Sequence, residues 1–386
     1  MIPAGYTFRN ILQHKVTSAL TILGISLVVF VFSGSLMLSH GLKATLVATG
    51  TDGNVIAIRK SSQTEVMSIV DYEQARILAT SPEIARDEND APFLTNEIYV
   101  LIGLKSRSNG DEAQVVVRGV TPNSMKLRPM IKMVEGRMWN DPGSEIIAGS
   151  EAAKRFIGCG LGEQVRFGAR QWTVVGIFDA GGTGFDSELR CEINQATDAF
   201  RRPVYSSVTF RLADTSGFAA FKQKIEDDRR LTLEIKQEKE YYEAQSRYTT
   251  TFISIAGSVI SIVFSLGAII GAMITMYAAV ANRVKEIGTL RALGFSRFSI
   301  LTSFLTESML IALSGGALGV LAAYFLGFFR ISTTNWDTFS EIAFNFEMSW
   351  AIAISALVFS LLMGIIGGFL PAVRAARLKI IDTLRA

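Results

Sequence analysis

Long runs without a single charged residue dominate the hydropathy pattern of this chain. The longest extends from Tyr248 to Asn282. A helix of about 20 apolar residues crosses a bilayer, so this run is roughly half as long again as one span requires. Three further runs, at 16–39, 308–329 and 348–373, are also long enough to cross and do not alternate like barrel strands. The pattern therefore predicts four transmembrane helices.

The stretch between the first two runs is polar and mixed, with turn residues at regular intervals. We expect an α+β domain there, with strands at 54–59, 114–120, 144–147, 207–212 and 231–236, a hairpin over 165–175, and helices at 71–80, 151–156 and 218–228 capped at Asp71 and Ser216. The segment 238–247 favours helix and enters the second run without a breaker. We expect one continuous helix there, paired with an extension of the first helix past Ser39.

Lysine and arginine residues are distributed asymmetrically among the connections. They are frequent in the N-terminal tail, in the 283–297 loop and in the C-terminal tail, whereas the loop between spans three and four holds Arg330 alone beside three acids. The positive-inside rule therefore predicts cytoplasmic termini. The expected organisation is a cytoplasmic segment (1–15), span one (16–39), a periplasmic α+β domain with helical stalk (40–247), span two (248–282), a cytoplasmic coupling loop (283–298), span three (299–329), a short periplasmic loop (330–347), span four (348–373) and a cytoplasmic tail (374–386).

Composition excludes several classes of function. The chain is 49% hydrophobic and 19% charged, and a net charge of +3 is too small to indicate a nucleic-acid partner. Two histidines and two cysteines leave little material for a metal site, and no serine–histidine–acid arrangement is visible. Cys159 and Cys191 both fall in the predicted periplasmic domain. A disulfide between them is therefore chemically permitted, and two unpaired small hydrophobic residues are the alternative.

No phosphate-binding G-x-x-x-x-G-K-[ST] motif occurs, nor any Gly-Lys pair that could form one. We therefore expect a non-catalytic subunit, with any ATP and magnesium bound by a separate ATPase chain.

The basic loop after span two carries apolar residues at helical spacing. Ile287, Leu290 and Leu293 mark one face of a short helix, and Gly294 is suited to end it. From the residues alone, two interpretations stay open: a basic connector that obeys the positive-inside rule, or an amphipathic helix that docks into a cytoplasmic protein.

The segment from Arg283 to Gly294 resembles the signature R-x-x-E-I-G-x-x-R-A-x-G of the MacB/FtsX-like ABC transporter permeases. Segments 20–25 and 371–385 resemble two other family motifs, and weaker matches occur at 117–120, 135–137, 161–165 and 174–176. Ile380 and Thr383 depart from the family pattern of proline and alanine, which puts the sharp turn of the C-terminal tail in doubt.

The resemblance implies a permease of a bacterial cytoplasmic membrane that works with an ABC ATPase and a second permease protomer, identical or paralogous. It implies export or extraction of an amphiphilic substrate, with a periplasmic adaptor or acceptor protein and membrane lipid as further partners. An FtsX-like transmitter that activates a cell-wall hydrolase, or a lipoprotein-release permease, is the alternative. The residues expected to couple to the ATPase are Arg283, Lys285, Glu286, Ile287, Gly288, Arg291, Ala292 and Gly294.

Two further features concern the spans themselves. Glu307 precedes an apolar run, and we expect it to make a structural or coupling contact, with a basic residue of the 283–297 loop as a candidate partner. Small residues allow close helix packing, within one chain or across a dimer seam, and the candidates are Gly24, Gly267, Gly271, Gly315, Gly319 and Gly367.

Overall fold

A computed structural model describes residues 15–140, 143–335 and 337–378 of the chain. The chain divides into two compact units. The first, here called the helical unit, comprises residues 15–40, 251–329 and 345–378. The second, here called the sheet unit, comprises 41–250 and 330–344. The predicted departures at Ile380 and Thr383 lie outside the described residues.

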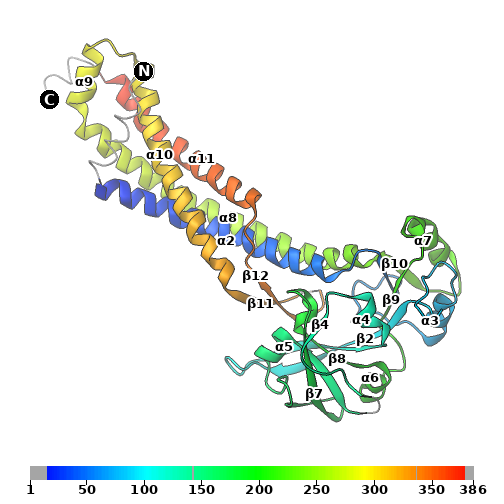
Figure 1. The fold of residues 1–386 in the computed structure, drawn as a ribbon. Helices are drawn as coiled ribbons and strands as arrows, with labels where there is room; N and C mark the ends of the chain where they lie inside the picture. The colour runs from blue at the N-terminus through cyan, green and yellow to red at the C-terminus, as the bar shows by residue number, and fades with distance from the viewer. Residues whose placement is uncertain (1–14, 141–142, 336, 379–386) are drawn as a thin grey trace. The chain divides into compact units, whose positions relative to one another are not determined.

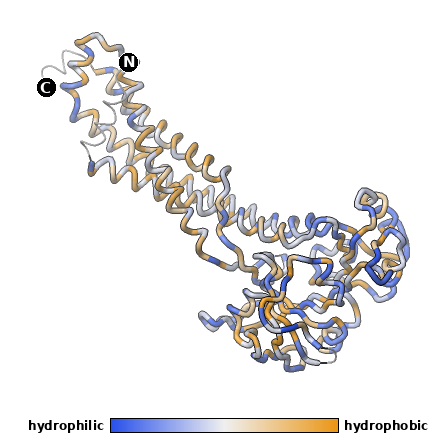
Figure 2. The backbone as a smooth tube through the Cα atoms, viewed as in Figure 1, coloured by the Kyte–Doolittle hydropathy of each residue, from blue (hydrophilic) through white to orange (hydrophobic). Residues whose placement is uncertain are grey.

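Four helices of the described chain are long and apolar enough to cross a membrane, which confirms the predicted number (Figure 1). Hydrophobic residues predominate along them within the helical unit (Figure 2). They are α2 (Lys15–Thr49), α8 (Glu238–Asn282), α10 (Arg297–Tyr324), which continues into the 3-10 turn η3 (Phe325–Phe328), and α11 (Trp350–Arg377). The short helix α9 (Val284–Ala292) follows α8.

Glycines let helices of the helical unit approach closely. A Cβ atom at Gly315 would lie 2.8 Å from the carbonyl oxygen of Ile22, and one at Gly319 would lie 2.6 Å from that of Ser26. Gly367 is similarly close to α8, since its Cβ would lie 3.2 Å from the Cβ of Ala272. These three glycines therefore pack within the protomer, as expected for small residues in membrane helices.

The other three predicted packing glycines do not pack within the protomer. A Cβ atom at Gly24, Gly267 or Gly271 would have no described atom of a neighbouring element within 4 Å. These positions lie on helix faces where large apolar side chains are exposed. Of the two alternatives, packing across a dimer seam stays a prediction for them.

A ten-stranded sheet forms the sheet unit, in the order β10-β1-β9-β2-β3-β8-β5-β7-β4 with β6 paired to β7. Pairing is mostly antiparallel, but β3 pairs with β8 and β5 with β7 in parallel. The strands are β1 (Asn54–Arg59), β2 (Leu94–Lys105), β3 (Glu112–Val120), β4 (Lys132–Gly136), β5 (Glu145–Gly149), β6 (Gln164–Phe167), β7 (Arg170–Asp179), β8 (Glu188–Glu192), β9 (Ser207–Arg211) and β10 (Leu233–Gln237).

Short helices cover this sheet and bury its apolar side chains in several clusters. They are α3 (Tyr72–Ala79), α4 (Asn123–Leu127), α5 (Ser150–Arg155), α6 (Ile193–Phe200), α7 (Phe218–Asp227) and the 3-10 turns η1 (Gly184–Ser187) and η2 (Thr215–Gly217). The α+β class and most predicted elements are confirmed. One predicted cap is wrong: Gly217 caps α7, because the Ser216 hydroxyl instead donates to the Asp214 carboxylate in η2.

The predicted continuous helix is present, because α8 begins at Glu238 directly after β10. The extension of α2 past Ser39 pairs with it inside the sheet unit. Lys43 Nζ lies 2.8 Å from Glu243 Oε1, and a Cβ atom at Gly50 would lie 2.4 Å from the Lys239 Cα. The pairing expected between the two helix extensions is confirmed.

The segment between α10 and α11, predicted only as a short loop, forms two strands. These are β11 (Arg330–Thr334) and β12 (Glu341–Asn345), which make a separate two-stranded sheet. Residues 330–344 belong to the sheet unit. Sequence reasoning missed this hairpin because its strands have only five residues each and β11 is mostly polar.

Candidate functional site

The residues that resemble the family signature lie on α9 and at its two ends. α8 ends at Asn282, Arg283 is the N-cap residue of α9, and Gly294 follows the C-cap Leu293 with a φ of +96°. Only glycine adopts that conformation without strain, and the Gly294 N–H donates to the Arg291 carbonyl oxygen at 3.1 Å. The predicted helix and its glycine stop are confirmed.

The apolar face of α9 is only partly as predicted. Ile287 is buried in a cluster with residues of α8, α10 and α11, and Leu290 is half-buried. Leu293 is 73% exposed instead of packing against the bundle, because α9 ends before it and the chain turns away. Of the motif residues, Arg283, Ile287 and Gly288 are buried, Glu286 and Arg291 are half-buried, and Lys285, Ala292 and Gly294 are exposed.

Arg283 and Glu307 form a two-pronged ion pair. Arg283 Nη1 donates to Glu307 Oε2 at 2.8 Å and Nη2 donates to Oε1 at 3.0 Å, with both side chains 7% exposed. The expected contact between Glu307 and a basic loop residue is thus present. Such a parallel pair fixes the relative orientation of the groups it joins, here the start of α9 and the middle of α10.

Two other motif side chains have unusual surroundings. Burial and the nearby charge of Glu307 raise the pKa of Glu286 above its ordinary value. The Nε of Arg291 is buried without a hydrogen-bond partner among the described residues. The roles of these side chains in coupling remain a prediction.

A buried charge network lies in the sheet unit, and sequence reasoning missed it. Its members are at most 5% exposed, and they are Arg118, Arg128, Arg190, Glu65, Glu97, Glu188 and Glu238. Arg118 lies within the apolar run of β3, and a charge in such a run is a signal that could have been followed.

Arg118 is the centre of this network. Its Nε and Nη2 donate to Glu188 at 2.9 and 2.8 Å, and its Nη1 donates to Glu65 at 2.8 Å and to Glu97 at 2.6 Å. Arg128 Nε donates to Glu238 Oε1 at 2.9 Å, and Arg128 also contacts Glu97. Charge-assisted bonds of this kind are strong when every partner is satisfied.

The network attaches the first residue of α8 to the sheet. Besides Arg128, Glu238 accepts hydrogen bonds from the Thr51 N–H at 3.0 Å and from Asn54 Nδ2 at 2.9 Å. Burial by itself would raise the pKa of Glu97, but the charges of Arg128 and Arg118 outweigh it and lower that pKa to about 2. The Glu97 carboxylate is therefore held in the charged form.

Arg190 is the poorly satisfied member. Its Nε and Nη2 have no hydrogen-bond partner among the described residues, and burial lowers its pKa to about 10. It stands beside Arg118 on the neighbouring strand, in parallel register, and its guanidinium lies 4.6 Å from the ring centroid of Phe185.

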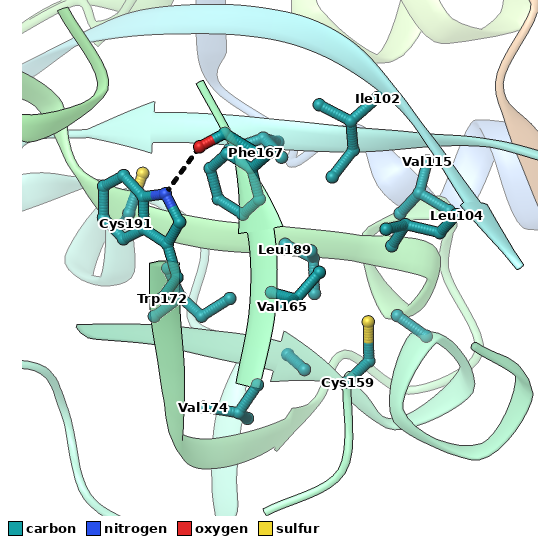
Figure 3. Close-up of a cluster of buried hydrophobic side chains, with 14 of the residues drawn as sticks. Ile102, Leu104, Val115, Cys159, Val165, Phe167, Trp172, Val174, Leu189 and Cys191 are labelled. Atoms are coloured by element: carbon teal, nitrogen blue, oxygen red, sulfur yellow. Dashed lines mark hydrogen bonds between the residues drawn. The ribbon is translucent and has the colours of Figure 1, made fainter. Parts of the chain in front are cut away.

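The two cysteines are free and fully buried, so the structure does not contain the disulfide considered above. Figure 3 draws Cys191 beside Trp172, whereas Cys159 lies on the other side of the cluster, beyond Leu189 and Val165. Burial raises the pKa of both thiols, that of Cys159 to about 12. They fill the core as small hydrophobic residues, which was the alternative interpretation.

Comparisons with known proteins cover almost the whole chain. Residues 18–228 match the family described as MacB-like periplasmic core domain, and residues 258–380 match that described as FtsX-like permease C-terminal. The uncharacterized ABC transporter permease YknZ of Bacillus subtilis is 26% identical over 97% of this chain and 96% of its own length.

Two further similarities are partial. The macrolide export ATP-binding/permease protein MacB of a Shewanella species is 25% identical over 96% of this chain, which spans 58% of that relative's length. A crystal structure of the periplasmic region of MacB from Actinobacillus actinomycetemcomitans is 13% identical, with a TM-score of 0.38 over 50% of this chain and 92% of that one. The motifs and the two family matches together establish that this chain belongs to the MacB/FtsX-like family of ABC transporter permeases.

Proposed function

We propose that this permease couples ATP hydrolysis on a separate ATPase chain to movement of its sheet unit, which expels or extracts an amphiphilic substrate. In this proposal α9 and both termini face the cytoplasm and the sheet unit lies in the periplasm. The positive-inside distribution of basic residues supports that orientation. An ATPase partner is implied by membership of the ABC permease family.

The observation that carries the proposal is the continuity of α8. This helix has 45 residues and contributes its first turns to the sheet unit and the remainder to the helical unit. At about 1.5 Å per residue it is roughly 68 Å long, more than twice the thickness of the hydrocarbon core. A movement applied at its α9 end can therefore act on the sheet unit through one unbroken element.

Both ends of this element are held firmly. At the α9 end, the Arg283–Glu307 ion pair joins the start of α9 to α10, so that a push on α9 acts on both helices. At the other end, the buried charge network holds Glu238 against the sheet. These attachments support transmission because neither end of α8 is a flexible linker.

The surface formed by α9 and the start of α10 suits an ATPase partner. Leu293 and Phe298 are 73% and 70% exposed, and the basic residues Lys285 and Arg297 are exposed near them in sequence. Exposed large apolar residues with charged neighbours are typical of docking surfaces. We infer that these side chains enter a groove of the ATPase.

A second permease protomer has a suitable surface on α8. Gly267 and Gly271 stand four residues apart on a face where Phe264 and Ile274 are exposed, and no described neighbour occupies the space beside the glycines. This supports close helix packing between protomers.

Co-purification tests the coupling proposal. We expect Leu293→Ser and Phe298→Ser to reduce the amount of ATPase retained by the permease in nanodiscs, and to reduce permease-dependent ATP hydrolysis in parallel. Leu161→Ser is the matched control, because Leu161 is 45% exposed but lies in the sheet unit. Full retention of the ATPase by both the Leu293 and the Phe298 variant would refute the docking assignment.

A further inference from the structure

The hairpin β11–β12 is held to the sheet unit by two ion pairs of opposite polarity. Arg330 of the hairpin contacts Glu151 of α5, and Arg155 of α5 contacts Glu341 of the hairpin. Arg155 also contacts the Ser332 hydroxyl. Because each side contributes one cation and one anion, shifting or reversing the hairpin would oppose like charges, so the pairs define a single docked position.

These ion pairs are partly removed from water. Glu151 is 7% exposed and Glu341 is 13% exposed. Loss of Arg155 would leave the largely buried Glu341 carboxylate without this cation, which is costlier than losing an exposed surface pair, whereas Glu151 keeps a second ion pair, with Lys154 Nζ at 3.2 Å.

Apolar burial and a backbone bond support the same attachment. Ile342, Ala343 and Phe344 of β12 are 7%, 7% and 2% exposed. The Ala343 N–H donates to the Ser187 hydroxyl at 3.2 Å. An isolated two-stranded hairpin is at best marginally stable in water, so this one depends on its attachment to the sheet unit.

The hairpin also covers a polar cavity in the sheet unit. Side chains of Asn335 and Ser340 line it from the hairpin, and Tyr99, Arg118 and Glu188 line it from the sheet. The charge network therefore lies directly beneath the hairpin.

The connections on both sides of the hairpin are short. Phe329 alone separates η3 from β11, and residues 346–349 separate β12 from α11. Even fully extended, four residues span only about 14 Å. A displacement of the adjoining end of α10 therefore acts on β11 through a single residue, and a large displacement of α11 acts on β12 through a short connection.

We propose that this hairpin is a strap that transmits movement of α10 and α11 to the α5 side of the sheet unit, as a second route beside α8. This inference rests on the proposed function. Arg330, Glu341, Glu151 and Arg155 are then positioning residues, whose task is to keep the strap attached while the helices move.

Charge exchange in the full chain, bound to its ATPase in nanodiscs, tests this proposal. Glu341→Arg and Arg155→Glu each oppose like charges, and we expect amide hydrogen exchange in 330–344 to accelerate by about tenfold or more. The double variant restores an opposite pair, so its exchange should return to within about threefold of the wild type. Glu341→Gln adds no repulsion, so its amide hydrogen exchange in 330–344 should be faster than that of the wild type and slower than that of the charge-reversed variants. This variant keeps the proposal testable if the charge-reversed variants fail to fold.

The functional readout is the change in exchange of the sheet unit on trapping the ATPase with ATP and vanadate. We expect this change to fall by about half or more in the single variants, and to recover in the double variant. Arg137→Glu is the matched control, because Arg137 forms an exposed ion pair with Glu145 in the same unit but does not touch the hairpin.

The possible results separate the two proposals. An undiminished ATP response in single variants whose strap has loosened would overturn the strap, while leaving coupling through α8 intact. Failure of the double variant to recover either readout would also overturn it. Absence of any ATP response in the wild type would instead refute the proposed function.

Discussion

Two buried arginines on neighbouring strands should respond in opposite ways to the same substitution. Arg118 and Arg190 are register partners in β3 and β8, and both are 0% exposed. We predict that Arg118→Met strongly destabilises the sheet unit, whereas Arg190→Met has little effect or stabilises it.

The difference follows from what each guanidinium satisfies. Arg118 donates to Glu65, Glu97 and Glu188, so its loss leaves buried carboxylates without their main cation. Breaking a buried ion pair from one side costs about 3–5 kcal/mol. In a unit of this size, 1 kcal/mol shifts the melting temperature by about 2–4 °C, so we expect a loss of roughly 6–20 °C.

The loss of Arg190 leaves no carboxylate unsatisfied. Glu188 keeps both bonds from Arg118, and Arg190 itself has two buried nitrogens without hydrogen-bond partners among the described residues. Replacing such a charge with an apolar side chain removes its ion pair with Glu188, in which Nη2 lies 3.6 Å from Oε2, and also its repulsion from Arg118, and these two effects oppose each other. The expected change is below about 1 kcal/mol, or a small gain.

The chain carries its own reporter for this measurement. Cys159 and Cys191 are its only cysteines, and both are fully buried in the sheet unit. A thiol-reactive fluorescent dye therefore labels the detergent-solubilised protein only as that unit opens. Equal melting temperatures for the two variants would refute the reasoning, and so would a larger loss in Arg190→Met.

Acid should weaken the same unit: the pKa of Glu97 is lowered to about 2 from an ordinary 4.5, so its contribution is complete above about pH 4.5 and is lost towards pH 2. Tryptophan-fluorescence melts between pH 7 and 3 check this, and a flat profile would contradict it. In α10, Gly319→Leu should cost about 1–3 kcal/mol because its Cβ would lie 2.6 Å from a carbonyl oxygen of α2. Ala322→Leu, at an exposed position of the same helix, is the control in light-scattering melts. Glu307→Gln should uncouple ATP hydrolysis, since it removes the charge facing Arg283, whereas Glu307→Asp should retain part of the coupling.

The sequence predicted the helical unit well because a bilayer imposes a simple rule. A charge-free run of sufficient length has few alternatives to a spanning helix, and four such helices are present. The continuity of α8 was also predictable, since 238–247 contains no helix breaker. The α9 helix and its glycine stop followed from local spacing and backbone chemistry.

Features that depend on long-range pairing were not predictable in the same way. The charge network joins β2, β3 and β8 to the start of α8, and no local pattern brings Glu97 to Arg118 or Arg128 to Glu238. The strands β11 and β12 have only five residues each, and the ion pairs that hold them come from α5, far away in the sequence. Local propensity carries no information about either arrangement.

The open faces at Gly24, Gly267 and Gly271 show a different limit. Small-residue spacing indicates close packing but does not identify the neighbour. Gly315 and Gly319 carry similar spacing and pack inside the protomer. The two cases differ only in which surfaces the rest of the bundle has already covered.

The hairpin imposes an order on biosynthesis. The first segment of the sheet unit ends at Thr250, and its last piece begins at Arg330, after the whole of Thr251–Phe329. A nascent chain can thus form the large sheet early, but Glu151 and Arg155 meet their partners only after α10 has entered the bilayer. Until then the polar cavity beneath the hairpin stays uncovered. Completion of the sheet unit consequently waits for synthesis of the whole segment between its two pieces.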